Sequence, residues 1–213
     1  MKKYELTAEF IEKWGKKLFR IKALISFGSV EAGELGGYVE KEDNLAQDGD
    51  AWVCDDAWVY GNARVYDDAW VYGDARVYGN AEVYGDARVY GNARVCDDAW
   101  VYGNAEVCGN ARVCDDAWVY GNAWVCGNAD YLLIGRIGSR FSFTTFFKNK
   151  DKGITVSCGC FLGTIAEFRA KVTDTHGNNK HAKMYNLAAD MAELQILGEE
   201  HFDKLNTNKS EPF

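Results

Sequence analysis

The sequence lacks several features that would place it in a familiar functional class. It has no apolar run near the roughly 20 residues that a membrane-spanning helix needs. The segment before Phe27 carries scattered charges in place of the basic and apolar regions of a signal peptide. Basic residues are outnumbered, because 24 Lys and Arg stand against 32 Asp and Glu and leave a formal net charge of −8. A nucleic-acid binder needs a basic face to displace counterions from phosphate, so direct nucleic-acid binding is not expected.

The cysteine count predicts the compartment. Seven cysteines form an odd number, and no secretion signal precedes them. We therefore expect a cytoplasmic protein with reduced thiols. The single proline, Pro212, stands against 22 glycines, and aromatic residues reach 14% of the chain. A fold for this sequence must place many large, flat side chains.

What the sequence has in abundance is a six-residue repeat. Thirteen copies fill residues 51–128 without an insertion, with Ala first and Val third in each copy. Residues two apart share one face of a strand, so these side chains are predicted to point inward. Positions five and six are Gly-Asn, Gly-Asp or Asp-Asp, which accept the backbone of a corner. The repeat predicts a prism with three strands and about 18 residues per coil.

This array resembles the hexapeptide-repeat proteins of the left-handed parallel β-helix family. In that family a small residue follows an aliphatic one by four positions, as Ala57 follows Val53 and Ala63 follows Val59. The resemblance covers residues 51–128 and implies a left-handed parallel β-helix. The Ala-x-Val-Tyr-Gly-Asn pattern also looks like arrays in phage and prophage proteins of unassigned role.

The resemblance does not extend to the chemistry of the family's acyltransferases. Those enzymes use a histidine that reaches into a groove between subunits. The histidines here are His176, His181 and His201, all outside the repeats. Acyltransferase activity is therefore not expected, and no cofactor is predicted.

Every third repeat is predicted to fall on the same side of the prism, so outward residues form ladders. Neighbouring strands lie about 4.8 Å apart, close enough for identical rings to stack. One ladder, from Trp52 to Trp124, is predicted to face outward. The candidate partner-binding residues come from the other two sides: Trp58, Arg76, Arg94, Arg112, Tyr66, Tyr84, Tyr102, Tyr120, Trp100 and Trp118. Two alternatives stay open, namely rings that only stabilise the prism and rings that bind a flat ligand.

Four cysteines follow the same geometry. Cys96 and Cys114 fall one coil apart on one side, and Cys108 and Cys126 do so on another. A tetrahedral metal site needs four ligands, and no histidine lies in the repeats. We therefore interpret these cysteines as replacements for Tyr in a stack, and no metal is predicted.

Residues 1–50 are expected to cap the β-helix, which we assign to residues 51–129. Apolar residues near Trp14 recur at helical spacing and favour a helix, although a strand pair that turns at Gly15 is the competing assignment. An irregular first coil follows, in which Leu45 and Gln47 stand at the Ala and Val positions of the repeat.

Residues 130–198 are predicted to form a small α+β domain, and residues 199–213 a polar tail. Three strands are expected within residues 131–140, 141–150 and 153–161. A capping box of Thr164 and Glu167 then predicts a helix that ends near Gly177, and a second helix spans 179–197. The fold class is mainly β, a parallel β-helix with an N-terminal cap and this C-terminal domain.

A basic patch is predicted on the first two strands of this domain. Its members are Arg136, Arg140, Lys148, Lys150 and Lys152. In an acidic protein, such a patch binds phosphate or an acidic partner. A solvated hairpin edge is the alternative.

The function we expect is that of a non-enzymatic scaffold that forms a dimer or trimer and binds a protein partner. By analogy with phage proteins, the partner would be a host nuclease or defence complex, inhibited in an anti-CRISPR-like manner in the host cytoplasm. Corner carboxylates such as Asp97 and Asp98 would then mimic phosphate. Two alternatives are a carbohydrate- or nucleotide-binding module and an enzyme that uses His176, Cys158 or Cys160.

Overall fold

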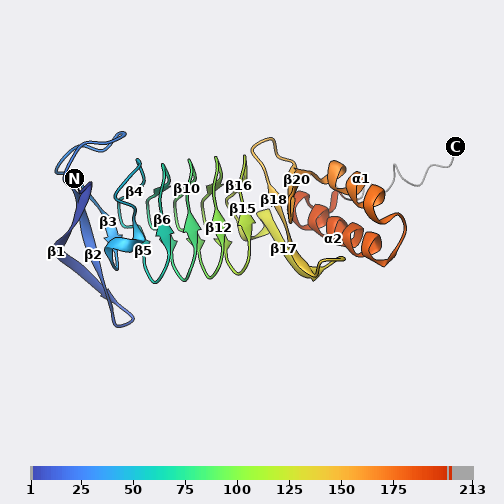
Figure 1. The fold of residues 1–213 in the computed structure, drawn as a ribbon, viewed down its shortest axis with the longest axis horizontal. Helices are drawn as coiled ribbons and strands as arrows, with labels where there is room; N and C mark the ends of the chain where they lie inside the picture. Colours follow the sequence, from blue (N-terminus) through green and yellow to red (C-terminus); the bar gives the residue numbers. More distant parts are fainter. Residues whose placement is uncertain (1, 201, 203–213) are drawn as a thin grey trace. The chain divides into compact units, whose positions relative to one another are not determined.

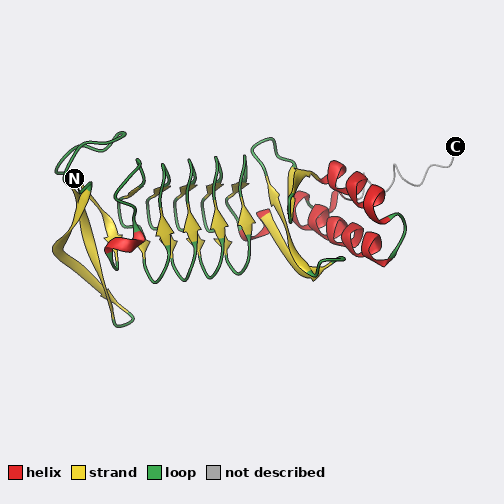
Figure 2. Ribbon diagram, in the orientation of Figure 1, coloured by secondary structure: helices red, strands yellow, loops and turns green. Residues whose placement is uncertain are grey.

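The computed structural model describes residues 2–200 and 202, and its contacts divide the chain into two compact units. The first unit comprises Met1–Asn122 with Cys126–Asn128, and the second comprises Ala123–Val125 with Ala129–Phe213. Figure 1 shows the order of the elements along the chain, and Figure 2 separates helices from strands.

The repeats form a parallel β-solenoid in which every repeat contributes one two-residue strand. Val53 pairs with Val71 and Trp52 with Trp70, so paired residues are 18 apart in the sequence. The strands are β4 (Trp52–Val53), β5 (Trp58–Val59), β6 (Arg64–Val65), β7 (Trp70–Val71), β8 (Arg76–Val77), β9 (Glu82–Val83), β10 (Arg88–Val89), β11 (Arg94–Val95), β12 (Trp100–Val101), β13 (Glu106–Val107), β14 (Arg112–Val113), β15 (Trp118–Val119) and β16 (Trp124–Val125). Their sheets have the orders β4-β7-β10-β13-β16 and β6-β9-β12-β15, and β5-β8-β11-β14 extend a sheet of N-terminal strands.

The core of the solenoid contains the Ala and Val of every repeat. Each of these side chains is buried, with an exposed fraction of 0% or 1%. Backbone hydrogen bonds link successive coils, for example from Trp58 N to the carbonyl of Ala75 at 2.9 Å. The inward orientation predicted from the spacing of two is confirmed.

The corners depend on backbone with positive φ. Most corners place Gly at the fifth repeat position, as at Gly73 with φ 70°. Asp55 occupies this position with φ 54° and Asp67 with φ 59°, a conformation that Asp tolerates better than most residues. Their carboxylates accept hydrogen bonds from the next coil, from Gly73 N at 3.0 Å and from Gly85 N at 3.3 Å.

The N-terminal segment is a hairpin, so the predicted helix is wrong and the competing strand pair is correct. Strands β1 (Tyr4–Lys13) and β2 (Lys16–Ala23) pair antiparallel. The turn residues Trp14 and Gly15 have φ of 51° and 74°, which suits a two-residue hairpin turn. The turn geometry therefore overrides the helical spacing of the apolar residues.

The first coil is two residues longer than the others. Strand β3 (Leu35–Val39) pairs antiparallel with β2 and parallel with β5, and Val39 lies opposite Val59. After the short helix η1 (Glu42–Asn44), Leu45 lies opposite Val65 and so fills a Val position. Leu45 was predicted at an Ala position, so the register is corrected by two residues.

Gln47 and Trp52 also depart from the prediction. The Gln47 Oε1 accepts hydrogen bonds from the backbone of Lys3 at 2.8 Å and of Tyr4 at 3.3 Å. Gln47 therefore binds β1 instead of standing at a Val position. Trp52 is 0% exposed because the rings of Tyr4 and Phe27 cover it, with centroids 6.4 and 5.4 Å away. The N-terminal segment therefore covers Trp52, the first residue of this ladder.

The second unit combines an antiparallel sheet with two helices. After η2 (Asn128–Asp130), the strands β17 (Tyr131–Ile137), β18 (Ser142–Lys148), β19 (Ile154–Cys158) and β20 (Phe161–Thr164) follow in spatial order. Helices α1 (Ile165–His176) and α2 (Lys180–Leu197) share a buried core with the sheet. The fourth strand was not predicted, because a turn at Gly159, φ 60°, divides the segment that was assigned to the third strand.

Both predicted helices are confirmed, including their caps. Thr164 and Glu167 form the capping box of α1, and Gly177 ends that helix. The side chain of Asn179 accepts hydrogen bonds from the first backbone N–H groups of α2. Most of the predicted polar tail, residues 199–213, lies outside the described residues. Neither helix in the described ranges has the length and apolarity required to cross a bilayer.

Candidate interaction surfaces of the solenoid

The side built on β6, β9, β12 and β15 carries stacked aromatic rings, as predicted. The tyrosines at the fourth repeat position have ring centroids 4.8, 4.8 and 4.6 Å apart, with planes within 6° of parallel. Trp100 and Trp118 stack beside them at 5.2 Å. We call this set the tyrosine–tryptophan face: Tyr66, Tyr84, Tyr102, Tyr120, Trp100 and Trp118.

The rings of the tyrosine–tryptophan face are uncharged and already stacked. Burial raises the pKa of Tyr66 and Tyr102 above the ordinary value, and the carboxylate of Glu82 adds to this at Tyr66. The Tyr66 hydroxyl donates a 2.7 Å hydrogen bond to Glu82. Trp118 keeps 39% of its surface exposed. A stack that is fixed before binding loses little conformational entropy when a partner covers it.

A second side carries cationic groups in register. Arg76 pairs with Arg94, and Arg94 with Arg112, on the parallel strands β8, β11 and β14. Trp58 precedes them, and the guanidinium of Arg76 lies 4.4 Å from its ring centroid. We call Trp58, Arg76, Arg94 and Arg112 the arginine face. Like charges at directly paired positions repel one another, so this face favours an anionic partner.

The hairpin turn of the first unit extends the arginine face. The Trp14 ring lies 5.9 Å from the rings of both Trp58 and Tyr60, and 66% of Trp14 is exposed. Trp14 was not among the predicted partner-binding residues. The sequence does place Trp14 beside the turn glycine Gly15. A tryptophan at a turn is not expected to be buried, and this could have identified Trp14 as an exposed aromatic residue.

A groove of about 650 Å³ lies on the third side of the solenoid. Trp70 and Tyr72 provide ring surface, and carboxylates provide hydrogen-bond acceptors. Residues Gly28 and Ser29, from the segment before β3, also line this groove. This groove was not predicted, because nothing in the repeat places residues 28 and 29 there. The lining residues that carry rings or charged groups are Trp70, Tyr72, Arg88, Asp50, Asp68 and Asp86.

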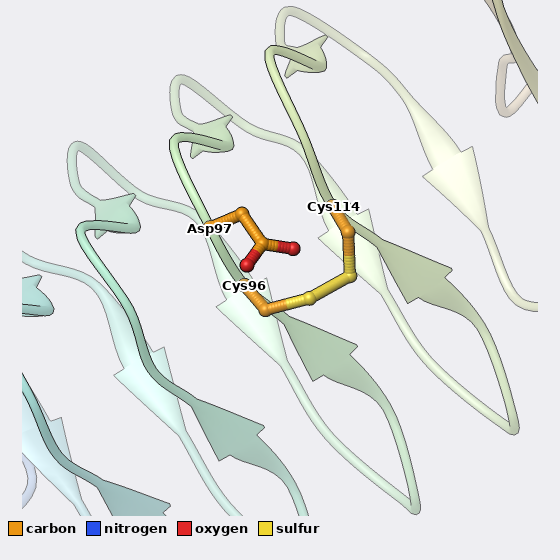
Figure 3. A group of neighbouring side chains, drawn as sticks. All are labelled: Cys96, Asp97 and Cys114. Atoms are coloured by element: carbon orange, nitrogen blue, oxygen red, sulfur yellow. A yellow bond between two sulfur atoms is a disulfide. The ribbon is translucent and has the colours of Figure 1, made fainter.

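Four repeat cysteines form disulfides, which corrects the expectation of reduced thiols. Cys96 is bonded to Cys114 (Figure 3), and Cys108 is bonded to Cys126. Because paired cysteines are 18 residues apart, adjacent coils bring the Cα atoms of Cys96 and Cys114 to 4.6 Å. That separation lies within the range usual for a disulfide. Three of these four cysteines are buried, so they do not belong to the outer wall.

The predicted basic residues divide into two groups. Arg136 lies on β17 and Arg140 precedes β18, whereas Lys148 ends β18 and Lys150 and Lys152 lie in the turn after it. A seven-residue strand separates the groups by roughly 20 Å. The Lys148 ammonium forms a 3.1 Å ion pair with Asp130. The structure thus does not bring the five residues into one patch.

In the second unit, His176 and Cys158 lie beside Tyr185. The ring of His176 is 5.8 Å from those of His181 and Tyr185. Burial raises the pKa of Tyr185 to about 12, and the neighbouring Cys158 contributes. Cys160 is exposed.

Asp174 lies two residues before His176, but its carboxylate is engaged elsewhere. Asp174 forms an ion pair with Lys171 at 3.4 Å. The Cys158 sulfur accepts a 3.2 Å hydrogen bond from the hydroxyl of Thr144. Neither arrangement provides the base and orienting carboxylate that nucleophilic catalysis requires.

Comparison with known proteins supports the repeat architecture. No curated protein was found to match the chain. The family model described as the YdcK beta solenoid repeat matches residues 57–73, 69–85, 75–91, 81–97, 87–103 and 111–127. The matched segments cover less than half of the chain. The repeat region is therefore similar to the YdcK beta solenoid repeat, and its fold is a parallel β-solenoid.

Proposed function

We propose that this chain is a non-enzymatic interaction protein that associates with a second copy and binds an acidic protein partner. The observation that carries the proposal is the register of the outward side chains. Adjacent coils present the same chemical group at the same place, so a flat ring surface and a row of cations run along two sides. Each surface matches one kind of partner.

The tyrosine–tryptophan face is the proposed contact between copies. Its rings combine apolar area with hydroxyl groups at the rim, a composition enriched at protein interfaces. Two copies of one such face meet symmetrically across a two-fold axis, because the surface is the same on both. The exposed Trp118 is the residue most suited to act as an anchor.

Light scattering coupled to size-exclusion chromatography tests this contact. The wild-type chain is expected to have twice or three times the mass of the monomer, and Trp118→Glu is expected to be monomeric. Arg88→Glu is the matched control, since Arg88 is equally part of a repeat but lies on the groove side. A monomeric wild-type chain, or an assembly that survives Trp118→Glu, would contradict this part of the proposal.

The arginine face is the proposed site for the acidic partner. Arg94 and Arg112 are exposed, and neither forms an ion pair with another residue in the described part of the chain. A partner that supplies carboxylates or phosphates at this spacing relieves the repulsion between them. From the phage-like style of the repeats, the same proposal names a host defence protein as the partner, which it would inhibit.

Quantitative affinity capture from a bacterial lysate tests the arginine face. A bound protein should be lost with the double variant Arg94→Glu and Arg112→Glu and retained with Arg88→Glu. Its capture should also weaken as the salt concentration rises, because charge contacts are screened. If the amount of captured protein is unchanged by both charge reversal and salt, the arginine face is excluded as its binding site.

A second candidate function is carbohydrate binding, and the groove favours it. Sugars stack on aromatic rings, as Trp70 and Tyr72 allow, and their hydroxyl groups donate to carboxylates such as Asp68. Three carboxylates disfavour a nucleotide phosphate in the same groove. A titration of intrinsic tryptophan fluorescence against a glycan panel should show saturable change that Trp70→Ala abolishes. No change with any glycan would remove this candidate.

A further inference from the structure

Two copies of the tripeptide Cys-Asp-Asp lie one above the other at one corner of the solenoid. They are residues 96–98 and 114–116, which follow the parallel neighbours β11 and β14. Cys96 is 0% exposed and Cys114 is 6% exposed. One ligand atom each from Cys96, Asp97 and Cys114 lies within 4.8 Å of the other two (Figure 3).

This arrangement matches the dimensions of a small metal site. Zinc binds thiolate sulfur at about 2.3 Å and carboxylate oxygen at about 2.0–2.2 Å. Two tetrahedral ligands of one ion are therefore roughly 3.5–4 Å apart. To reach these values, the two sulfur atoms have to be reduced and to move apart from bonding distance, whereas the carboxylate of Asp97 already lies within 4.8 Å of both. Water is available as the fourth ligand, because Asp97 is exposed.

The sulfur atoms are joined in the structure, and a disulfide cannot supply two thiolates. We propose that Cys96 and Cys114, when reduced, bind a thiophilic divalent cation such as Zn²⁺ together with the carboxylate of Asp97. The disulfide is the cation-free state of the same site. The site thus holds either a metal ion or a covalent link between coils.

A low-molecular-weight disulfide is sufficient to convert one state into the other. The Cys114 thiolate, the more exposed of the two, attacks one sulfur of the small disulfide and releases its first thiolate. The Cys96 thiolate then displaces the second, which forms the bond between Cys96 and Cys114. The protein loses two electrons, the small disulfide gains them, its two thiolates take protons from water, and the cation leaves.

The other repeat cysteines lack one part of this arrangement. Cys108 and Cys126 also lie on adjacent coils, but Gly109 and Gly127 follow them, so no carboxylate stands beside the sulfurs. Cys54 is followed by Asp55, but the next coil places Tyr72 above it. Within residues 51–128, all of them described, two cysteines and a carboxylate meet only at this corner.

Asp97 occupies a corner position that is filled by glycine in the preceding coils. The same corner in the two preceding coils has Gly61 and Gly79, with φ of 73° and 77°, and Asp97 has φ 58°. Asp55 and Asp67, at other corners, accept a hydrogen bond from the next coil. No such bond is made by Asp97 in the described structure, and its carboxylate lies beside the sulfurs (Figure 3).

One neighbouring cation has to be considered. Arg112 Nε donates a 3.4 Å hydrogen bond to the Cys114 sulfur. In the reduced protein this contact stabilises a thiolate. Arg112 is exposed and turns towards water when a cation binds, while Asp98 and Asp116 keep the corner acidic.

Titration with Cd²⁺ tests the proposal on the full chain, kept reduced with a phosphine that has no thiol. The readout is the sulfur-to-cadmium charge-transfer absorbance, which reports thiolate binding directly. We expect one Cd²⁺ per chain, lost in the double variant Cys96→Ala and Cys114→Ala. The matched control, Cys108→Ala with Cys126→Ala, removes an equivalent pair without a carboxylate and should retain the site.

Asp97→Gly separates the ligand role from folding. Glycine suits the backbone here, so the variant should fold at least as well as the wild type, yet Cd²⁺ should bind at least about tenfold more weakly. Oxidation by glutathione disulfide should release Cd²⁺ while the thiols of Cys96 and Cys114 are lost. Three results would overturn the proposal. They are charge-transfer absorbance that persists without Cys96 and Cys114, an unchanged Cd²⁺ affinity in Asp97→Gly, and no Cd²⁺ binding by the reduced chain.

Discussion

At the scale of single residues, the fold depends on small apolar side chains in a narrow interior. Val89 is 0% exposed, whereas its neighbour Arg88 on the same strand faces outward. The spacing of two in the repeat was sufficient to predict this difference. Which outward residues stay exposed was not predictable, because Tyr4 and Phe27 cover Trp52 from a segment outside the repeat.

Val89→Ala should destabilise the solenoid by about 2 kcal/mol, because it removes buried methyl groups and leaves a cavity. Arg88→Ala, one residue earlier, should change stability by less than about 0.5 kcal/mol. Urea unfolding followed by circular dichroism measures both. Equal effects of the two substitutions would mean that the valine does not face the interior.

Cys54 should resist alkylation at pH 8, whereas Cys160 should react. Burial raises the pKa of Cys54 to about 12, with a further contribution from Asp55, so the reactive thiolate is scarce. Cys160 is exposed. Peptide mass mapping after a short iodoacetamide pulse distinguishes the two sites. Comparable labelling of both in the folded chain would show that Cys54 is accessible and ionisable.

At the scale of elements, local sequence signals predicted some features and failed for others. The capping box identified α1 because Thr164 and Glu167 satisfy backbone groups within one turn. The hairpin at Trp14 was missed in favour of a helix because positive φ at a tryptophan has no sequence signature. Strand β20 was missed because Gly159 was not recognised as a turn.

Thr164→Ala should destabilise the second unit by about 1 kcal/mol, since the cap hydrogen bond to Glu167 N is lost. Thr173→Ala is the control within the same helix, because its hydroxyl bonds only the carbonyl of Arg169. Thermal unfolding monitored by circular dichroism at helical wavelengths compares them. A larger loss in Thr173→Ala than in Thr164→Ala would contradict the assigned start of α1.

The tyrosine ladder should make the solenoid sensitive to alkali. Burial raises the pKa of Tyr66, Tyr84 and Tyr102 in the folded state above the ordinary value of 10. Above pH 10 the unfolded chain releases these protons and the folded chain retains them. Their contribution to stability is therefore complete below pH 10 and declines as the pH rises further.

Tyrosinate absorbance and circular dichroism, recorded together from pH 8 to pH 12.5, test this prediction. Ionisation of the ladder should coincide with loss of β structure. Tyr102→Phe should move the transition to higher pH. Full ionisation near pH 10 in a chain that stays folded would show that the rings are not held in a buried stack.

At the scale of the whole molecule, the repeat period explains most of the architecture and most of the candidate surfaces. The 18-residue separation aligns Arg76 with Arg94 and Tyr84 with Tyr102, and both ladders follow from the sequence. The same separation brings Cys96 to Cys114, and their position one coil apart was predicted. Their disulfide was not predicted, because the expected cytoplasmic compartment favoured reduced thiols. The groove near Trp70 required knowledge of where residues 28–29 lie.

The central claim is that each coil of the repeat region, residues 51–128, contains 18 residues, and engineered cross-links measure this directly. In one variant Arg76→Cys and Arg94→Cys are combined, and in the control Arg76→Cys is combined with Arg88→Cys, twelve residues apart. After mild oxidation, peptide mass mapping should find positions 76 and 94 joined and positions 76 and 88 unjoined. A link in the control variant without one in the first would contradict the coil and the ladders built on it.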